Sequence, residues 1–126
     1  MKSIAYWFIG LATLFALAGM AFGIYMSATG VHDLAPAHAH NNLIGYVTMM
    51  LYGLYYKVVP QATRGTLPVV HFWVSLLGAL TMGVGVGLAI SMQGELLAQI
   101  ASFATIIGMA IFAVIVWRHR AELTAA

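Results

Sequence analysis

A chain of 126 residues in which 63% are hydrophobic and 6% are charged does not have the composition of a soluble domain, where about a quarter of the residues are charged. The net charge of +2 does not require an anionic partner such as a nucleic acid, because the five Lys and Arg residues all lie close to the ends of apolar stretches. Cysteine is absent, which excludes disulfides, iron–sulfur clusters and thiolate metal sites.

Four apolar stretches are long enough to cross a bilayer, whose hydrocarbon layer of ~30 Å needs about 20 helical residues. They cover roughly residues 4–26, 38–59, 68–92 and 96–117. Because they use nearly the whole chain, we expect one all-α domain, residues 1–126, folded as a four-helix transmembrane bundle. The first stretch exceeds the ~7–15 apolar residues of a signal peptide, so we expect it to be retained.

The charges predict how these helices are oriented. All the basic residues fall on one side of a four-pass chain: Lys2, Lys57, Arg64, Arg118 and Arg120. Cytoplasmic loops are enriched in Lys and Arg, so both termini are expected to be cytoplasmic. The histidines that precede or open the second stretch, His32, His38 and His40, then face outward.

Two histidines and two asparagines open the second stretch, at His38, His40, Asn41 and Asn42. An unpaired polar group in a membrane costs several kcal/mol, so an ionisable residue there is a functional candidate by default. In a chain without cysteine, imidazole is the strongest ligand type, and neutral imidazole suits iron, copper and zinc. The sequence therefore predicts a metal or haem site on the outer side.

The orientation of His38 relative to His40 depends on the local backbone. On an α-helix the two side chains point about 200° apart. His38 then shares a face with a small and polar stripe: Asn42, Gly45, Met49, Tyr52 and Tyr56. His40 shares a face with an aliphatic stripe: Ile44, Val47, Leu51 and Leu54. If the helix instead starts at Asn41 or Asn42, both histidines point the same way in extended chain, and His32 could join them around one metal ion.

His71 opens the third stretch, on the side of the membrane opposite His40. The separation is on the order of 20–30 Å, so the two residues are not expected to share a mononuclear site within one subunit. Beside Trp73, His71 has the composition of an interfacial belt. If His71 has a histidine partner, the geometry leaves His119 at the inner end of the fourth stretch. Two arginines flank His119, and we expect it to be a solvated tail residue.

The motifs around these histidines resemble a known family. The run His-Ala-His-Asn-Asn-Leu-Ile-Gly at residues 38–45, followed by Tyr-Gly-Leu-Tyr-Tyr at 52–56, resembles the second helix of haem–copper oxidase subunit I. The nearer relatives are the nitric oxide reductase and cbb3-type branches. His-Phe-Trp at 71–73 resembles that family's third helix, and the HAH motif is also similar to the haem–copper membrane protein of the bacterial nitric-oxide response.

The resemblance implies a haem b near the outer face, because the second-helix histidine of that family is an axial haem ligand. The His-x-Asn-Leu spacing favours His40 as the ligand, whereas the Tyr-Tyr pair favours His38. Ile44, Val47 and Leu51 would flank the porphyrin. Copper or zinc at a cluster of His32, His38 and His40 is the alternative. A full subunit I has many more helices, which carry its copper ligands, so this chain alone is not expected to reduce oxygen or NO.

The sequence leaves two functional hypotheses open. The first is a haem b- or metal-binding protein of the bacterial inner membrane, with a redox, gas-binding or cofactor-handling role, alone or beside a respiratory complex. The second is a cofactor-free structural or assembly subunit of a larger membrane complex. Because four helices do not enclose a haem, we expect a homo-oligomer, most simply a symmetric dimer. Gly19/Gly23 and Gly83/Gly87 have the spacing that lets helices approach closely.

Overall fold

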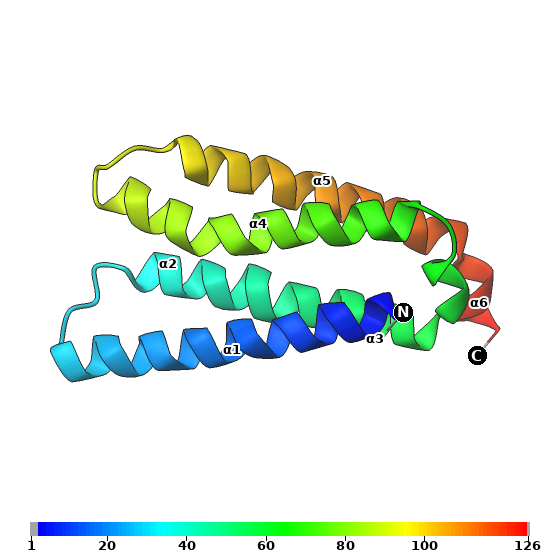
Figure 1. Ribbon diagram of the computed structural model, residues 1–126, viewed down its shortest axis with the longest axis horizontal. Helices are drawn as coiled ribbons and strands as arrows, with labels where there is room; N and C mark the ends of the chain where they lie inside the picture. Colours follow the sequence, from blue (N-terminus) through cyan, green and yellow to red (C-terminus); the bar gives the residue numbers. More distant parts are fainter. Residues whose placement is uncertain (1–2, 126) are drawn as a thin grey trace.

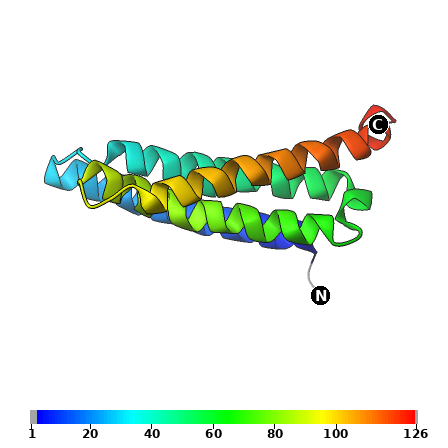
Figure 2. The same ribbon diagram turned by 90° about the horizontal axis from the view of Figure 1, so that it is seen from above.

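The computed structural model of the chain describes residues 3–125, which are mainly helical and contain no strand. The elements in chain order are α1 (Ile4–Thr29), α2 (Ala35–His40), the π-helix η1 (Asn41–Thr48), α3 (Met49–Val58), the short 3-10 helix η2 (Pro60–Thr63), α4 (Leu67–Ile90), α5 (Leu96–Arg118) and α6 (Arg120–Thr124). The all-α expectation is confirmed. In Figures 1 and 2, α1, the α2–η1–α3 rod, α4 and α5 run alongside one another.

Three of these helices, α1, α4 and α5, are long and apolar enough to cross a membrane. Large apolar side chains cover the outside of the bundle. Ile24, for example, is 71% exposed and Ile106 is 66% exposed. A surface of this kind is stable in lipid and unfavourable in water. The chain is therefore a membrane-embedded protein.

The helix ends follow from local chemistry. Ser3 caps α1, since its Oγ accepts a hydrogen bond from the Tyr6 backbone N–H at 3.3 Å. Gly30 ends α1 in the left-handed conformation, with φ of 68°, which a residue without Cβ adopts at little cost. Pro36 and Pro68 lie in the first turns of α2 and α4, where proline's missing N–H costs nothing.

The second helical rod begins earlier than the sequence predicts, at Ala35 rather than at residue 38. It continues without a break to Val58, but residues Asn41–Thr48 adopt a π-helix. His38 and His40 both lie in α2, so the extended-chain alternative is wrong and the two imidazoles point to opposite faces. Near the other end of the chain, Arg120–Thr124 forms the short helix α6.

The two glycine pairs contact helices of the same chain, which corrects the expectation that they form faces for a second copy. A Cβ at Gly19 would meet the side chain of Asn42. A Cβ at Gly23 would lie 3.2 Å from Cε1 of His38. Gly83 and Gly87 approach the second rod in the same way, with atoms of Asn41 at 3.2 Å and of Ala37 at 3.8 Å from the added Cβ positions. At these four glycine positions, α1 and α4 carry no Cβ, so the polar start of the second rod can pack closely against both helices.

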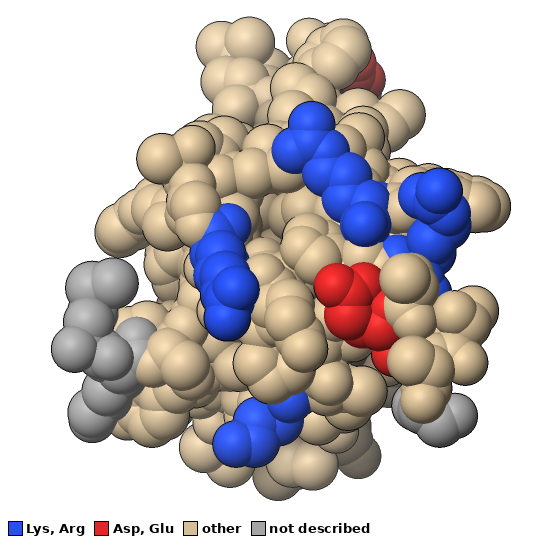
Figure 3. All heavy atoms as spheres, turned by 90° about the vertical axis from the view of Figure 1, so that its right-hand side faces the viewer, with Lys and Arg blue, Asp and Glu red and all other residues tan. Residues whose placement is uncertain are grey.

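The two ends of the bundle differ in charge. One end, which we name the basic end, carries the described basic residues Lys57, Arg64, Arg118 and Arg120, together with Glu122, and it faces the viewer in Figure 3. The opposite end carries Asp33 and Glu95 and, within residues 3–125, no Lys or Arg. The core is richest in aromatic rings toward the basic end, where Phe8 and Tyr56 are fully buried.

Candidate functional site

His38 points into the bundle between α1 and its own rod. Its side chain is half-buried, its ring lies 5.8 Å from that of Phe22, and its Nε2 is 3.1 Å from the Asn42 side-chain amide nitrogen. Its Nδ1 is buried and has no hydrogen-bond partner within residues 3–125. The stripe predicted to share this face is buried, as Gly45, Met49 and Tyr52 show. The interior orientation of His38 is therefore confirmed, and its Nε2 is occupied by Asn42.

His40 points outward on the opposite face. Its Nδ1 lies 2.7 Å from the backbone carbonyl oxygen of Pro36, one turn earlier. A carbonyl oxygen only accepts, so Nδ1 must carry the hydrogen. In the neutral imidazole the lone pair is then on Nε2, and no described residue bonds that atom.

The face below His40 is apolar and exposed, as its spacing predicts. Val47 is 40% exposed, Leu51 is 59% exposed, and Ile44 is half-buried. None of these side chains offers a polar atom. A flat apolar ligand beside His40 would therefore meet aliphatic surface.

His32 does not join these two residues. It lies in the turn between α1 and α2, exposed, with its Nδ1 3.1 Å from the Gly30 carbonyl oxygen. Within residues 3–125, no group of three or more His, Asp or Glu side chains lies close enough together to hold a metal ion. The arrangement found for His32, His38 and His40 thus offers separate imidazoles rather than a shared ion site.

His71 is fully buried, and the expectation that it belongs to an interfacial belt is wrong. Its Nδ1 lies 2.8 Å from the hydroxyl of Tyr56. Aromatic rings from other helices surround it, with ring centroids at 5.2 Å for Phe8, 4.5 Å for Tyr52 and 5.5 Å for Phe112. The hydrogen-bond partner of His71 is thus a tyrosine of α3.

His119, the histidine partner suggested for His71, bonds elsewhere. Its Nδ1 lies 2.9 Å from the Ile115 carbonyl oxygen, one turn back along α5. This is the same local contact that His40 makes to Pro36, but at the basic end between two arginines. His119 therefore serves as a matched control for His40.

Two buried polar groups near His71 were not singled out from the sequence. Ser75 lies one helical turn after His71, is 6% exposed, and has no hydrogen-bond partner for its Oγ within residues 3–125. Tyr56 belongs to the stripe predicted to face inward with His38, but nothing in the sequence paired it with His71. The four-residue spacing of His71 and Ser75 is the signal that could have identified them as neighbours on one helix face.

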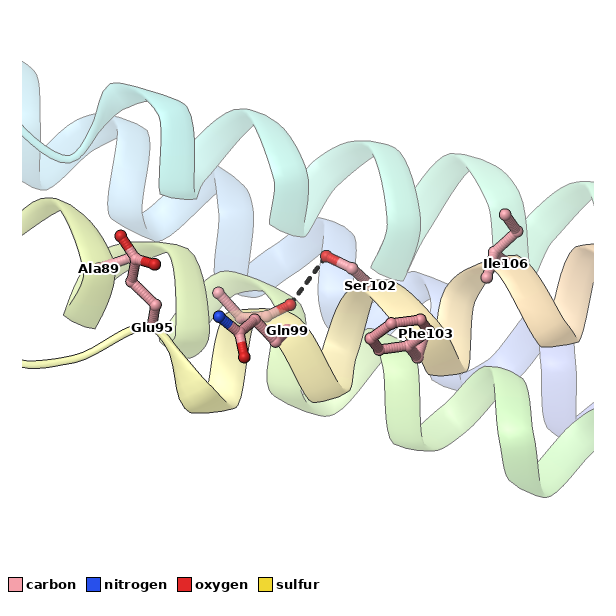
Figure 4. A pocket seen from close by; sticks show the side chains of 7 residues that line it. Ala89, Glu95, Gln99, Ser102, Phe103 and Ile106 are labelled. Carbon is pink, nitrogen blue, oxygen red and sulfur yellow. Dashed lines mark hydrogen bonds between the residues drawn. The ribbon is translucent and has the colours of Figure 1, made fainter.

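A groove of about 530 Å³ lies between α1 and the start of the second rod, and both His38 and Asn42 line it beside Gly19 and Gly23. A different groove, about 410 Å³, lies on α4 and α5 at the end opposite the basic one (Figure 4). Its polar side chains are Glu95, Gln99 and Ser102, and the Ser102 hydroxyl donates to the Ala98 carbonyl of its own helix at 2.8 Å. No described histidine lines this groove, so it offers no imidazole ligand.

Comparison of the chain with protein-family models, with curated proteins and with solved structures finds no match.

Proposed function

We propose that the chain is a four-pass membrane protein that binds haem b through His40 on the outer side of a bacterial inner membrane. The second rod supplies the fourth membrane crossing, since α2, η1 and α3 form one continuous helical path between the two ends of the bundle. The gathering of basic residues at one end supports cytoplasmic termini.

The observation that carries this proposal is the hydrogen bond from His40 Nδ1 to the Pro36 carbonyl. Haem- and metal-ligating histidines characteristically donate one ring N–H to a carbonyl or carboxylate, which fixes the tautomer and the ring orientation. His40 has this arrangement, and its Nε2 lies on an exposed surface with no hydrogen-bond partner among residues 3–125. The residues present therefore fit an axial ligand for haem iron.

The surroundings favour haem over a bare metal ion. A bare ion needs several donors converging in a small volume. No such group is found within residues 3–125. A haem needs only one or two axial ligands and apolar walls. Ile44, Val47 and Leu51 supply such walls on one side.

The exposure of this face supports a homo-oligomer. A porphyrin beside His40 would be covered on one side only by this chain, because the face is at the outside of the bundle. A second copy related by a two-fold axis would present the same surface and a second His40. We infer that the haem is held between copies, or between this chain and a partner in a respiratory complex.

His38 is the weaker ligand candidate. Its Nε2 would have to leave Asn42 before it could bind iron, and its Nδ1 is buried. Its contacts support a structural role in positioning the start of the second rod. Copper or zinc shared by His32, His38 and His40 remains the alternative cofactor and requires those side chains to come together.

Bound haem would supply a redox-active, gas-binding iron. The chain itself contributes an oriented imidazole and an apolar surface. The imidazole lies toward the end of the bundle opposite the basic end. A visible absorption spectrum with haem extraction and metal analysis of the purified protein tests the proposal. Haem b in a fixed ratio to the chain is expected, whereas a colourless, metal-free protein would favour the cofactor-free structural subunit.

A further inference from the structure

A groove of about 690 Å³ lies between α1 and α4 on the outside of the bundle. Ser3 and Thr63 lie at its mouth at the basic end, Trp7 and Trp73 form its walls, and Leu11 and Leu76 lie farthest from the mouth. It is separate from the histidines discussed above. Its lining is apolar apart from the two hydroxyls at the mouth and the indole N–H groups of the two tryptophans.

Those hydroxyls are already bonded within the chain. Ser3 Oγ accepts from the Tyr6 backbone N–H at 3.3 Å, and Thr63 Oγ1 donates to the Pro60 carbonyl at 2.7 Å. The groove therefore offers mainly apolar contact, and the indole N–H groups of Trp7 and Trp73 are its further hydrogen-bond donors. Trp7 is 47% exposed and Trp73 is 62% exposed, and tryptophan prefers the boundary between hydrocarbon and headgroups.

The basic residues at this end of the molecule favour an anionic ligand over a neutral one, although no charged residue among residues 3–125 lines the groove itself. Arg64 directly follows Thr63, and the end of the molecule on which the groove opens carries Lys57, Arg118 and Arg120 as well (Figure 3). Basic residues next to membrane helices attract anionic headgroups, and basic pockets between such helices bind anionic lipids. A neutral isoprenoid ligand would fill the groove but would gain nothing from these charges.

The length of the groove favours a lipid as its occupant over a membrane-spanning helix of a second copy. From Ile4 to Leu11 an α-helix rises about 10 Å at ~1.5 Å per residue, which is less than half of a ~30 Å hydrocarbon layer. A membrane-spanning helix of a second copy would need a groove across the full thickness. A phospholipid occupies only one leaflet.

We propose that this groove binds an anionic phospholipid from the leaflet at the basic end. One acyl chain lies between Trp7 and Trp73, and the phosphate lies at the mouth beside Arg64. The site is independent of haem binding. It gives the basic end a specific lipid contact in addition to its general attraction for negative charge.

Tryptophan fluorescence tests this proposal, because brominated acyl chains quench a tryptophan that they touch. The chain has three tryptophans, and Trp117 is 70% exposed at the same end but is not part of the groove. Two single-tryptophan proteins are compared: Trp7→Phe/Trp117→Phe, which keeps Trp73, and Trp7→Phe/Trp73→Phe, which keeps Trp117. Each is placed in phosphatidylcholine vesicles containing a small fraction of brominated phosphatidylglycerol or of brominated phosphatidylcholine.

At Trp73 we expect brominated phosphatidylglycerol to quench several-fold more than the same fraction of brominated phosphatidylcholine. At Trp117, which adjoins Arg118, we expect only the smaller preference that the general attraction of the basic end produces. Arg64→Gln should bring Trp73 close to the Trp117 result, and high salt should weaken the preference. Equal quenching by both lipids at Trp73, or the same anionic preference at both positions, would overturn the proposal. Native mass spectrometry of the unaltered chain gives a second readout, and release of no bound phosphatidylglycerol would also count against it.

Discussion

His38 and His40 are two residues apart, yet the structure gives them different chemistry. His38 bonds Asn42 inside the bundle, whereas His40 bonds a backbone carbonyl and leaves Nε2 free on the outside. The difference follows from the helical period, which turns neighbouring i, i+2 residues to opposite faces. A search for ligands by residue type alone would rank these two histidines equally.

His71 and Tyr56 form a buried pair that we expect to stabilise the fold. Tyr56→Phe removes the only hydrogen-bond partner of His71 within residues 3–125 while keeping the aromatic ring. Interhelical hydrogen bonds in membranes are worth ~0.6 kcal/mol on average, and a buried unsatisfied group costs about 1–3 kcal/mol. We therefore expect a loss of about 1–2 kcal/mol in the free energy of unfolding, measured by denaturation in mixed detergent.

The control for this change is Tyr46→Phe, because Tyr46 is 38% exposed and makes no comparable contact. It should leave stability within about 0.5 kcal/mol of the wild type. The double variant Tyr56→Phe/His71→Phe removes both polar partners and should recover part of the loss. If Tyr56→Phe were as stable as Tyr46→Phe, the pair would not contribute to stability.

At the scale of elements, the contact between α1 and the second rod depends on glycine. Gly19→Ala would place a Cβ on the side chain of Asn42, which must then rotate away from His38. We expect this variant to lower the free energy of unfolding by about 1 kcal/mol, the usual net value of one hydrogen bond. If His40 is the haem ligand, Gly19→Ala should nevertheless retain haem.

Gly10→Ala on the same helix is the matched control, since a Cβ there would meet nothing within 4 Å. It should be neutral or should stabilise the protein by up to ~1 kcal/mol, because alanine favours the helix more than glycine does. Equal effects of the two substitutions on the unfolding transition would contradict the close approach at Gly19.

The helices and their inward faces could be predicted from hydrophobic length and period. The buried stripe from Asn42 to Tyr56 and the exposed stripe below His40 both follow the helical spacing. The π-helix could not be predicted this way, because an i→i+5 pattern is rare and hydrophobic spacing does not indicate it. Within it, the Thr48 hydroxyl donates to the carbonyl of Leu43 at 2.8 Å, five residues back.

The burial of His71 could not be predicted from the sequence either. Next to Trp73, its composition is that of a membrane interface. Its burial depends on Phe8, Tyr52 and Phe112, which come from helices distant in the chain. The same holds for the glycine pairs, whose spacing predicts a close approach but not which helix approaches.

At the scale of the whole molecule, the basic end predicts the orientation in the membrane. The chain has no cysteine, so single cysteines can be introduced for labelling. Gln61 lies at the basic end and Gln93 lies in the turn between α4 and α5, and both are exposed. In intact cells, a membrane-impermeant thiol reagent should label Gln93→Cys and should reach Gln61→Cys only after lysis. The reverse pattern would place the termini outside.

Haem content per chain tests the central claim most directly, that His40 is the ligand. We expect His40→Ala to lose bound haem, His38→Ala to bind it more weakly, and His71→Ala to retain it. His119→Ala, which removes a histidine with the same backbone contact, should keep the wild-type content. Full haem occupancy in His40→Ala would contradict this claim, and full occupancy in both His40→Ala and His38→Ala would leave neither histidine as the ligand.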